Sequence, residues 1–281
     1  SVNGRWMAKT DYSDPEVRRI LVAQAVKTAE TFKNTRGVLM YLLGNESNYG
    51  LEWSSTAIEN LPSGDRLETK ARYLYSLFGE AISAVKAVDA RRPVGLVNGD
   101  IQYLQLIKEE ASNLDILAVN VYRGRKAYGS FYESIKIGLD KPMFFSEMGA
   151  DAFNAGTNSE DQFSQADYLR SQWEEIYQMA WGKGKAGNCL GATVFEWVDE
   201  WWKHGMDLHL DVHDAEGSWS NGAYDFDAQG GRNNMNEEWF GISAVASQTD
   251  GSINKRLPRA AYYLLDCTLL GERCLRLTVT Q

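Results

Sequence analysis

The chain is poor in cysteine, and it lacks long hydrophobic runs. Its 281 residues include three cysteines, whose spacing fits neither a disulfide framework nor a zinc site. No apolar stretch approaches the ~20 residues that cross a bilayer, so we expect no membrane association. The first residues are polar and do not resemble a signal peptide, so the sequence leaves the compartment open.

Positive charge is also scarce. Lys and Arg number 29 against 38 Asp and Glu, which gives a net charge of −9. This balance argues against a nucleic-acid partner, because phosphates require a basic surface. Aromatic residues, in contrast, are abundant, with 9 Trp and 14 Tyr. Each Trp is either part of a bulky core or a platform on which the apolar face of a sugar can stack.

An uncharged run, residues 37–43, is followed directly by a glycine, Asn45 and Glu46. Its length and its branched and aromatic residues predict a strand that is buried on both faces, as in a parallel sheet. Residues 142–146 repeat this pattern and lead to Glu147. Ligand sites of such folds lie beyond the C-terminal ends of the strands, so the sequence predicts two glutamates at one rim.

Further uncharged runs alternate with stretches of helical periodicity. We expect strands at residues 37–43, 93–97, 115–121, 142–146 and 191–196. We expect helices near residues 15–33, 65–90, 101–111, 130–138, 159–182 and 258–270. This alternation predicts an α/β fold with a parallel sheet and right-handed crossovers. We interpret residues 1–281 as a single domain, in which the polar stretch 198–255 is a long active-site loop.

Two sequences at strand ends resemble a known group of enzymes. Gly44-Asn45-Glu46 and Ser146-Glu147-Met-Gly-Ala are similar to motifs of the clan A retaining glycoside hydrolases, above all the barrel domain of family 2. That family includes β-galactosidases and β-glucuronidases. The resemblance implies a (β/α)8 TIM-type barrel in which residues 37–43 form strand four, so that this chain supplies strands four to eight. A second polypeptide or a further segment would then complete the barrel.

The resemblance also implies a role for individual residues. Glu46 would be the general acid/base, and Glu147 would be the nucleophile. Asn45 would donate a hydrogen bond to the 2-hydroxyl of the sugar, and Tyr122 would donate to Glu147 and orient it. Trp197, which ends the last strand, would lie under the sugar.

The stretch after Trp197 combines two Trp with two acids and a His, and we interpret it as a sugar-binding rim. Its residues are Asp199, Glu200, Trp201, Trp202 and His204. For the two Trp, a competing interpretation is a loop that is pinned to the barrel by its own aromatic side chains. We expect no metal. Asp225 begins a stretch like a calcium loop, but Asn236 stands where a bidentate glutamate is needed.

These features predict a retaining glycoside hydrolase that cleaves β-glycosidic bonds by double displacement through a covalent glycosyl-enzyme. Its partner would be an oligosaccharide or polysaccharide, and no cofactor is expected. Two alternatives stay open at this point: a transglycosylase that uses the same residues, and a non-catalytic carbohydrate-binding protein or inactive barrel fragment. Secretion or a periplasmic location would suit an enzyme that degrades polysaccharides.

Overall fold

The computed structural model of the protein describes residues 10–52, 58–125, 129–183, 185–203, 213–245 and 255–270. These residues form two compact units. Unit 1 takes those up to 121 together with 130–146 and 179–191, and unit 2 takes those in 122–129, 147–178 and from 192 onward. No helix within the described ranges is long and apolar enough to span a bilayer.

The sheet of unit 1 is built from parallel strands. Strand β1 (Tyr41–Leu43) pairs with β2 (Val94–Gly99), and β2 pairs with β3 (Ile116–Asn120), both in parallel. The sheet continues with β4 (Met143–Met148) and then β7 (Cys189–Val194), whose first residues belong to unit 1. The expected strand order is therefore confirmed in the part of the chain that is described.

Burial in this sheet is highest in β2 and β3 and lower in the strands on either side of them. Every residue of β2 and β3 is buried, as is usual in the middle of a parallel sheet. In β1, whose Tyr41 lies opposite Val94, only Tyr41 is buried. The prediction that residues 37–43 form a strand buried on both faces is therefore wrong. Among the described strands β1 lies at an edge of the sheet. The Arg92 side chain donates a hydrogen bond to the carbonyl of Val38, which lies before β1.

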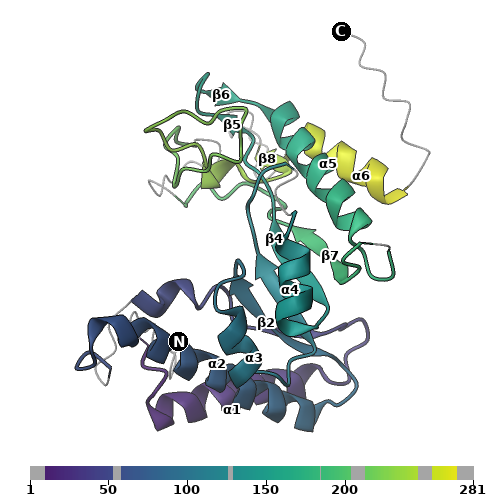
Figure 1. Ribbon diagram of the computed structural model, residues 1–281. Coiled ribbons are helices and arrows are strands. Elements are labelled where there is room, and N and C mark those ends of the chain that lie inside the picture. The colour runs from purple at the N-terminus through teal and green to yellow at the C-terminus, as the bar shows by residue number, and fades with distance from the viewer. Residues whose placement is uncertain are drawn as a thin grey trace. The chain divides into compact units, whose positions relative to one another are not determined.

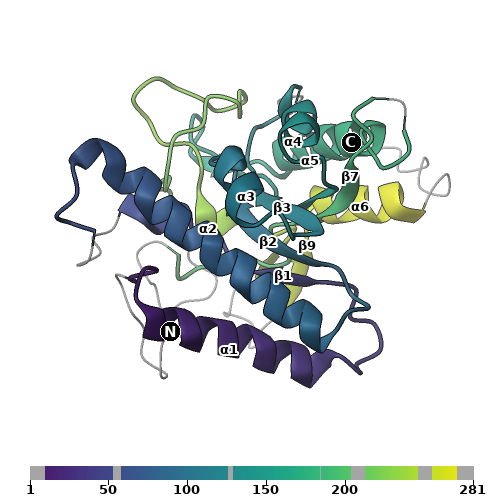
Figure 2. The same cartoon turned by 60° about the horizontal axis from the view of Figure 1, so that its bottom comes forward.

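Helices cover the sheet of unit 1 where the periodicity predicted them. They are α1 (Pro15–Phe32), α2 (Ser63–Val88), α3 (Leu104–Glu110) and α4 (Phe131–Leu139). Helix α1 begins at a cap, because the Asp14 carboxylate accepts hydrogen bonds from two backbone N–H groups of the first turn. Helix α2 packs against α1, and the two lie side by side in Figure 2. The apolar stripe of α2 includes Leu74, Phe78 and Ile82, all buried.

Unit 2 combines helices with short hairpins. Its elements are β5 (Phe153–Asn154), β6 (Ser159–Glu160), α5 (Gln162–Gln178), a 3-10 turn η2 (Glu237–Trp239), β8 (Ser243–Val245), β9 (Arg256–Pro258) and α6 (Ala260–Leu270). Helices α5 and α6 pack against each other (Figure 1). The expected helix 159–182 begins only at Gln162, because β5 and β6 pair as an antiparallel hairpin before it. The expected loop 198–255 contains η2 and β8, and β8 pairs with β9.

The core of unit 2 is aromatic. Tyr168 of α5, Tyr224 and Phe240 are buried together with Ala150 and Met235. These residues lie far apart in the sequence, on α5, on the segment after β4 and on the segment between residues 213 and 245. Side chains from three segments of unit 2 therefore meet around these rings.

Candidate active site

The turn that carries Asn45 and Glu46 has an unusual backbone. Gly44 has φ +76° and Glu46 has φ 49°, so both lie in the left-handed region. A side chain at Gly44 would also meet the ring of Phe78 at 2.8 Å. Glu46 is not a glycine, and such residues in this conformation concentrate at functional sites. The turn closes with a hydrogen bond from the Tyr49 N–H to the Glu46 carbonyl, at 2.9 Å.

Hydrogen bonds from the ends of β3 and β4 fix the side chain of Asn45. Asn120 Nδ2 donates to Asn45 Oδ1 at 2.9 Å, and Ser146 Oγ donates to Asn120 Oδ1 at 2.7 Å. The three side chains stand at the C-terminal ends of β1, β3 and β4, as predicted for a ligand site of a parallel sheet. Asn45 is exposed and its oxygen is engaged, so the amide hydrogens are what it can offer to a ligand.

Asn48 also fixes this turn, and our sequence reasoning did not select it. It is 4% exposed and pairs with Gly99 in both directions: Asn48 Nδ2 donates to the Gly99 carbonyl at 2.9 Å, and the Gly99 N–H donates to Asn48 Oδ1 at 2.7 Å. This pair ties the turn after β1 to the end of β2. The sequence gives no local signal for it, since Asn48 lies in a polar stretch 51 residues before its partner.

Within unit 2, Glu147 receives a hydrogen bond from Tyr122. The Tyr122 hydroxyl donates to Glu147 Oε2 at 2.9 Å, so the contact that we expected between these residues is confirmed. The ring of Tyr122 is held edge-on by Phe240, Trp219 and Phe195, with centroid separations of 5.5, 6.1 and 6.3 Å. A donor fixed in this way favours the ionised form of the carboxylate that it contacts.

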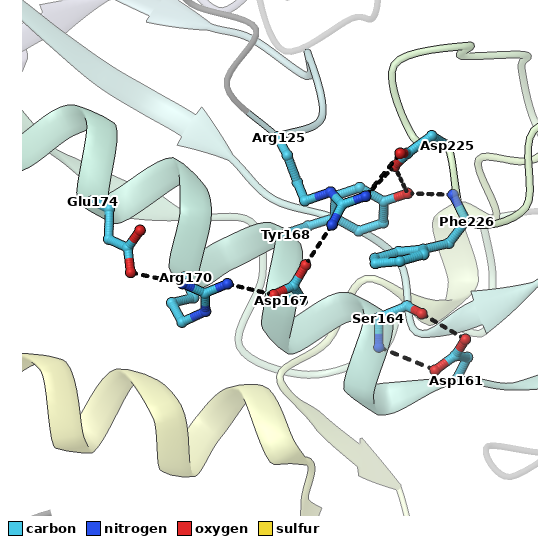
Figure 3. A network of polar contacts seen from close by, with 9 residues as sticks. All are labelled: Arg125, Asp161, Ser164, Asp167, Tyr168, Arg170, Glu174, Asp225 and Phe226. Carbon is cyan, nitrogen blue, oxygen red and sulfur yellow. Dashed lines mark hydrogen bonds and ion pairs between the residues drawn. The ribbon is translucent and has the colours of Figure 1, made fainter. Parts of the chain in front are cut away.

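A network of charged residues holds the segment that follows Tyr122 (Figure 3). The Arg125 guanidinium donates to Asp167 of α5 at 2.9 Å and to Asp225 at 2.7 Å, and it stacks on the ring of Phe226 at 4.2 Å. The hydroxyl of Tyr168 donates to Asp225 as well, at 3.2 Å. Arg125 therefore connects the segment after β3 with helix α5 and with the segment around Asp225.

Glu196 and Trp197 follow β7. Trp197 is 60% exposed, and its ring lies edge-on to Tyr262 at 5.8 Å. An exposed indole at a strand end is the geometry that sugar stacking needs. The Glu196 pKa is raised to about 9, first by burial and then by the negative charges of Glu200, Asp199 and Glu147. Its Oε1 is buried without a hydrogen-bond partner in the described residues.

Glu196 is a candidate site residue that the sequence reasoning missed. The signal was present, since three acids stand within five residues at the end of an apolar run. Negative charges crowded in this way raise the pKa of a neighbouring, partly buried carboxyl group. At neutral pH a carboxyl group with a pKa of about 9 is protonated and can donate a hydrogen bond.

Asp199 does not fit the predicted rim. It is fully buried, and its two oxygens accept hydrogen bonds from Arg259 at 2.6 and 2.8 Å. The Gly241 N–H donates to Oδ1 at 2.9 Å, and His213 Nε2 lies 3.0 Å from Oδ2. A carboxylate enclosed in this way joins segments of the protein and offers nothing to a sugar. We therefore do not assign Asp199 to substrate binding.

The remaining rim residues lie near one another in the sequence. The rings of Trp201 and Trp202 meet edge-on at 4.4 Å, and Trp202 is 43% exposed. Glu200 forms an ion pair with Lys203 at 3.3 Å. His204 lies outside the described residues. The described residues hold no group of three metal-ligating side chains.

The sequence matches one family model over most of its length. Residues 2–224 match the model described as glycosyl hydrolases family 2, TIM barrel domain. The chain belongs to glycosyl hydrolase family 2. Its fold class, a TIM barrel, is the one predicted from the sequence. Comparison with curated proteins gives no match.

Solved structures of glycosidases share the fold of this family 2 domain. A family 2 β-galacturonidase from Eisenbergiella tayi, bound to galacturonate, is 14% identical over 89% of this chain and 36% of its own, with a TM-score of 0.51. A β-D-glucuronidase from Dictyoglomus thermophilum is 13% identical over 94% of this chain and 37% of its own, with a TM-score of 0.54. A β-glucosidase from Thermotoga maritima in complex with noeuromycin is 12% identical over 92% of this chain and 69% of its own, with a TM-score of 0.58. The chain thus spans little more than a third of the first two structures.

Proposed function

We propose that this family 2 domain belongs to a retaining glycoside hydrolase that cleaves β-glycosidic bonds by double displacement. One observation carries the proposal: a glutamate at the end of a barrel strand, Glu147, accepts a hydrogen bond of 2.9 Å from the rigidly packed Tyr122. A nucleophilic carboxylate must be ionised and aimed, and a fixed hydroxyl donor serves both needs.

In the first step, Glu147 attacks the anomeric carbon while the bond to the leaving oxygen breaks. Glu46 donates its proton to that oxygen, and a covalent glycosyl-enzyme forms. In the second step, Glu46 takes a proton from water, the water oxygen attacks the anomeric carbon, and Glu147 departs as the carboxylate. Retaining chemistry of this kind requires the two carboxyl groups to stand about 5–5.5 Å apart across the scissile bond.

Other residues would bind the sugar. Asn45, whose oxygen is engaged by Asn120, donates its amide hydrogen to the 2-hydroxyl, and this bond strengthens in the transition state. The exposed ring of Trp197 stacks under the sugar. The rim beyond it holds further sugar units and is formed by Glu200, Trp201, Trp202 and His204.

The test measures hydrolysis of aryl β-glycosides by the intact protein. The panel includes β-glucuronide, β-galacturonide and β-glucoside, because solved relatives carry the names of enzymes for such sugars. Glu147→Ala should lower kcat by ~10²–10⁴-fold or more on every substrate, because no glycosyl-enzyme can form. Glu46→Ala should retain the first step on substrates with good leaving groups, which need little protonation. Glu30→Ala, an exposed residue of α1, is the control and should not change the rate.

Azide then separates the two roles. With Glu46→Ala, added azide attacks the glycosyl-enzyme without a general base, so activity should recover and a β-glycosyl azide should appear. With Glu147→Ala, azide enters from the opposite face and should give the α-azide. A product of inverted configuration from the wild-type protein would refute the double displacement. Transfer to sugar acceptors in place of water would identify a transglycosylase, and binding without turnover would identify a carbohydrate-binding protein.

A further inference from the structure

The hydroxyl of Tyr224 lies in the core of unit 2. Tyr224 is 1% exposed, and its hydroxyl donates to the Gly149 carbonyl at 2.6 Å. Gln172 of α5, which is fully buried, donates to the same hydroxyl at 3.4 Å, to the Gly149 carbonyl at 3.3 Å and to the Gly124 carbonyl at 3.2 Å. One phenol and one amide therefore hold two stretches of main chain.

These two stretches carry the proposed nucleophile and its donor. Gly124 stands two residues after Tyr122, and Gly149 stands two residues after Glu147. Both glycines are in close backbone contact, since a Cβ at Gly124 would lie 1.8 Å from the Ala223 carbonyl and a Cβ at Gly149 would lie 2.1 Å from the Phe195 carbonyl. The main chain on both sides of the hydrogen bond between Tyr122 and Glu147 is thus held next to Tyr224.

We propose that Tyr224 is a positioning residue, whose hydroxyl holds the main chain beyond Glu147 and, through Gln172, the main chain beyond Tyr122, and so sets the hydrogen bond between Tyr122 and Glu147. This inference rests on the proposed function, because it assigns Glu147 as the nucleophile. Tyr224 touches neither substrate nor reacting atoms. It acts by fixing the distance and the angle between the Tyr122 hydroxyl and the Glu147 carboxylate.

The physical reason is the steep dependence of a hydrogen bond on its geometry. The bond from Tyr122 to Glu147 measures 2.9 Å, and hydrogen bonds weaken quickly with distance and misalignment. Catalytic groups must be held to within about 0.5 Å of their working geometry by the residues that support them. Without the Tyr224 hydroxyl, the Gly149 carbonyl keeps, among the described residues, the longer bond from Gln172 at 3.3 Å, so the strand end that carries Glu147 can shift.

The test replaces single hydroxyl groups in the intact protein. Tyr224→Phe removes the hydroxyl and keeps the ring in the aromatic core. Tyr168→Phe is the matched control: Tyr168 is 3% exposed and its ring packs on Tyr224 at 4.8 Å, but its hydroxyl contacts Asp225 and the Phe226 N–H (Figure 3). Tyr122→Phe and the double variant Tyr122→Phe/Tyr224→Phe complete a double-mutant cycle with the wild-type protein and Tyr224→Phe.

We expect Tyr224→Phe to lower kcat on an aryl β-glycoside by about 10-fold with little change in KM, because a positioning error acts on the transition state. The acid limb of the kcat/KM profile should move to higher pH, since the carboxylate loses part of its hydrogen bond from Tyr122. In the Tyr122→Phe background the same change should cost less than about 2-fold, because the bond that it positions is already absent. Tyr168→Phe should leave the pH profile in place.

Other results would overturn the proposal. If Tyr224→Phe and Tyr168→Phe lower activity and melting temperature equally without moving the pH profile, Tyr224 only stabilises the core. If Tyr224→Phe lowers kcat by the same factor in the Tyr122→Phe variant as in the wild-type protein, Tyr224 again only stabilises the core. If the wild-type protein hydrolyses the glycoside and Tyr224→Phe matches it, only the positioning role fails. If the wild-type protein hydrolyses no glycoside and binds covalently to none, the proposed function fails instead.

Discussion

The two units hold their proposed catalytic residues in different ways. In unit 1, Asn45 and Glu46 stand on a turn between a strand of a parallel sheet and a short helical turn, and the side chains that fix it, Asn48 and Asn120, come from the turn itself and from a strand end of the same sheet. In unit 2, Glu147 and Tyr122 are held by side chains that reach across from α5 and from the segment between residues 213 and 245. Regular structure distributes its stability over many equivalent contacts, whereas a side chain that bridges segments has no substitute.

Unit 2 is therefore expected to respond sharply to single substitutions, and unit 1 is expected to respond mildly. Three comparisons between matched residues of the two units test this difference.

The largest effect is expected at the buried ion pair between Arg259 and Asp199. Both side chains are almost fully buried, so Arg259→Met leaves the Asp199 carboxylate enclosed with its main partner removed. Breaking a buried pair from one side costs about 3–5 kcal/mol of unfolding free energy. The control in unit 1 is Arg72→Met, which removes ion pairs of an Arg that is 42% exposed and should cost less than about 1 kcal/mol. Urea unfolding measures both, and equal losses would remove the distinction between the units.

A second comparison uses two glycines with positive φ. Gly37 of unit 1 has φ +91°, and a Cβ added there would meet nothing within 4 Å, whereas Gly124 of unit 2 has φ +68° and the Ala223 carbonyl at 1.8 Å. Gly37→Ala should cost about 1–2 kcal/mol for the backbone conformation alone. Gly124→Ala should cost more in urea unfolding, and it should also lower kcat because the segment after Tyr122 must move. If the two variants lose the same unfolding free energy, the segment around Gly124 accommodates the added Cβ at no extra cost.

The third comparison concerns the pH dependence of stability. The Glu196 pKa is raised from 4.5 to about 9, so between these pH values the folded protein keeps a proton that the unfolded chain releases. The contribution of this group to stability therefore falls as pH rises through that window. Glu196→Gln should raise the melting temperature more at pH 8 than at pH 5.

In unit 1, hydrogen bonds from Gln105 and Arg72 lower the pKa of Glu109 below 4.5. The contribution of Glu109 to stability therefore changes with pH in the opposite direction to that of Glu196. Its contribution is present above the unfolded pKa and is lost as pH falls through the folded one. Glu109→Gln should therefore lower the melting temperature slightly at pH 8 and less at acidic pH. Thermal unfolding across the pH range compares the two variants, and slopes of the same sign would contradict the assignment for Glu196.

The sequence predicts unit 1 better than unit 2 for a physical reason. Strands β2 and β3 and helix α2 are specified by local periodicity, and the cap at Asp14 is specified by its neighbours. The contact between Tyr122 and Glu147 came from resemblance to a family, since the residues alone do not specify it. Asp199 looked like a rim residue because its partner, Arg259, stands 60 residues later. Nothing in the residues near Asp199 indicates which distant cation it will meet.

The ion pairs of Arg259 also determine when the folding of unit 2 can be completed during synthesis. Its partners Asp199 and Glu160 precede it by 60 and 99 residues. At about 5–20 residues per second, these carboxylates leave the ribosome roughly 3–20 s before the guanidinium that neutralises them. Strands β1 to β3 can pair as soon as residue 120 has emerged, so the sheet of unit 1 is available while unit 2 is still open. A nascent chain arrested before Arg259 would therefore hold the Asp199 carboxylate without the guanidinium that neutralises it.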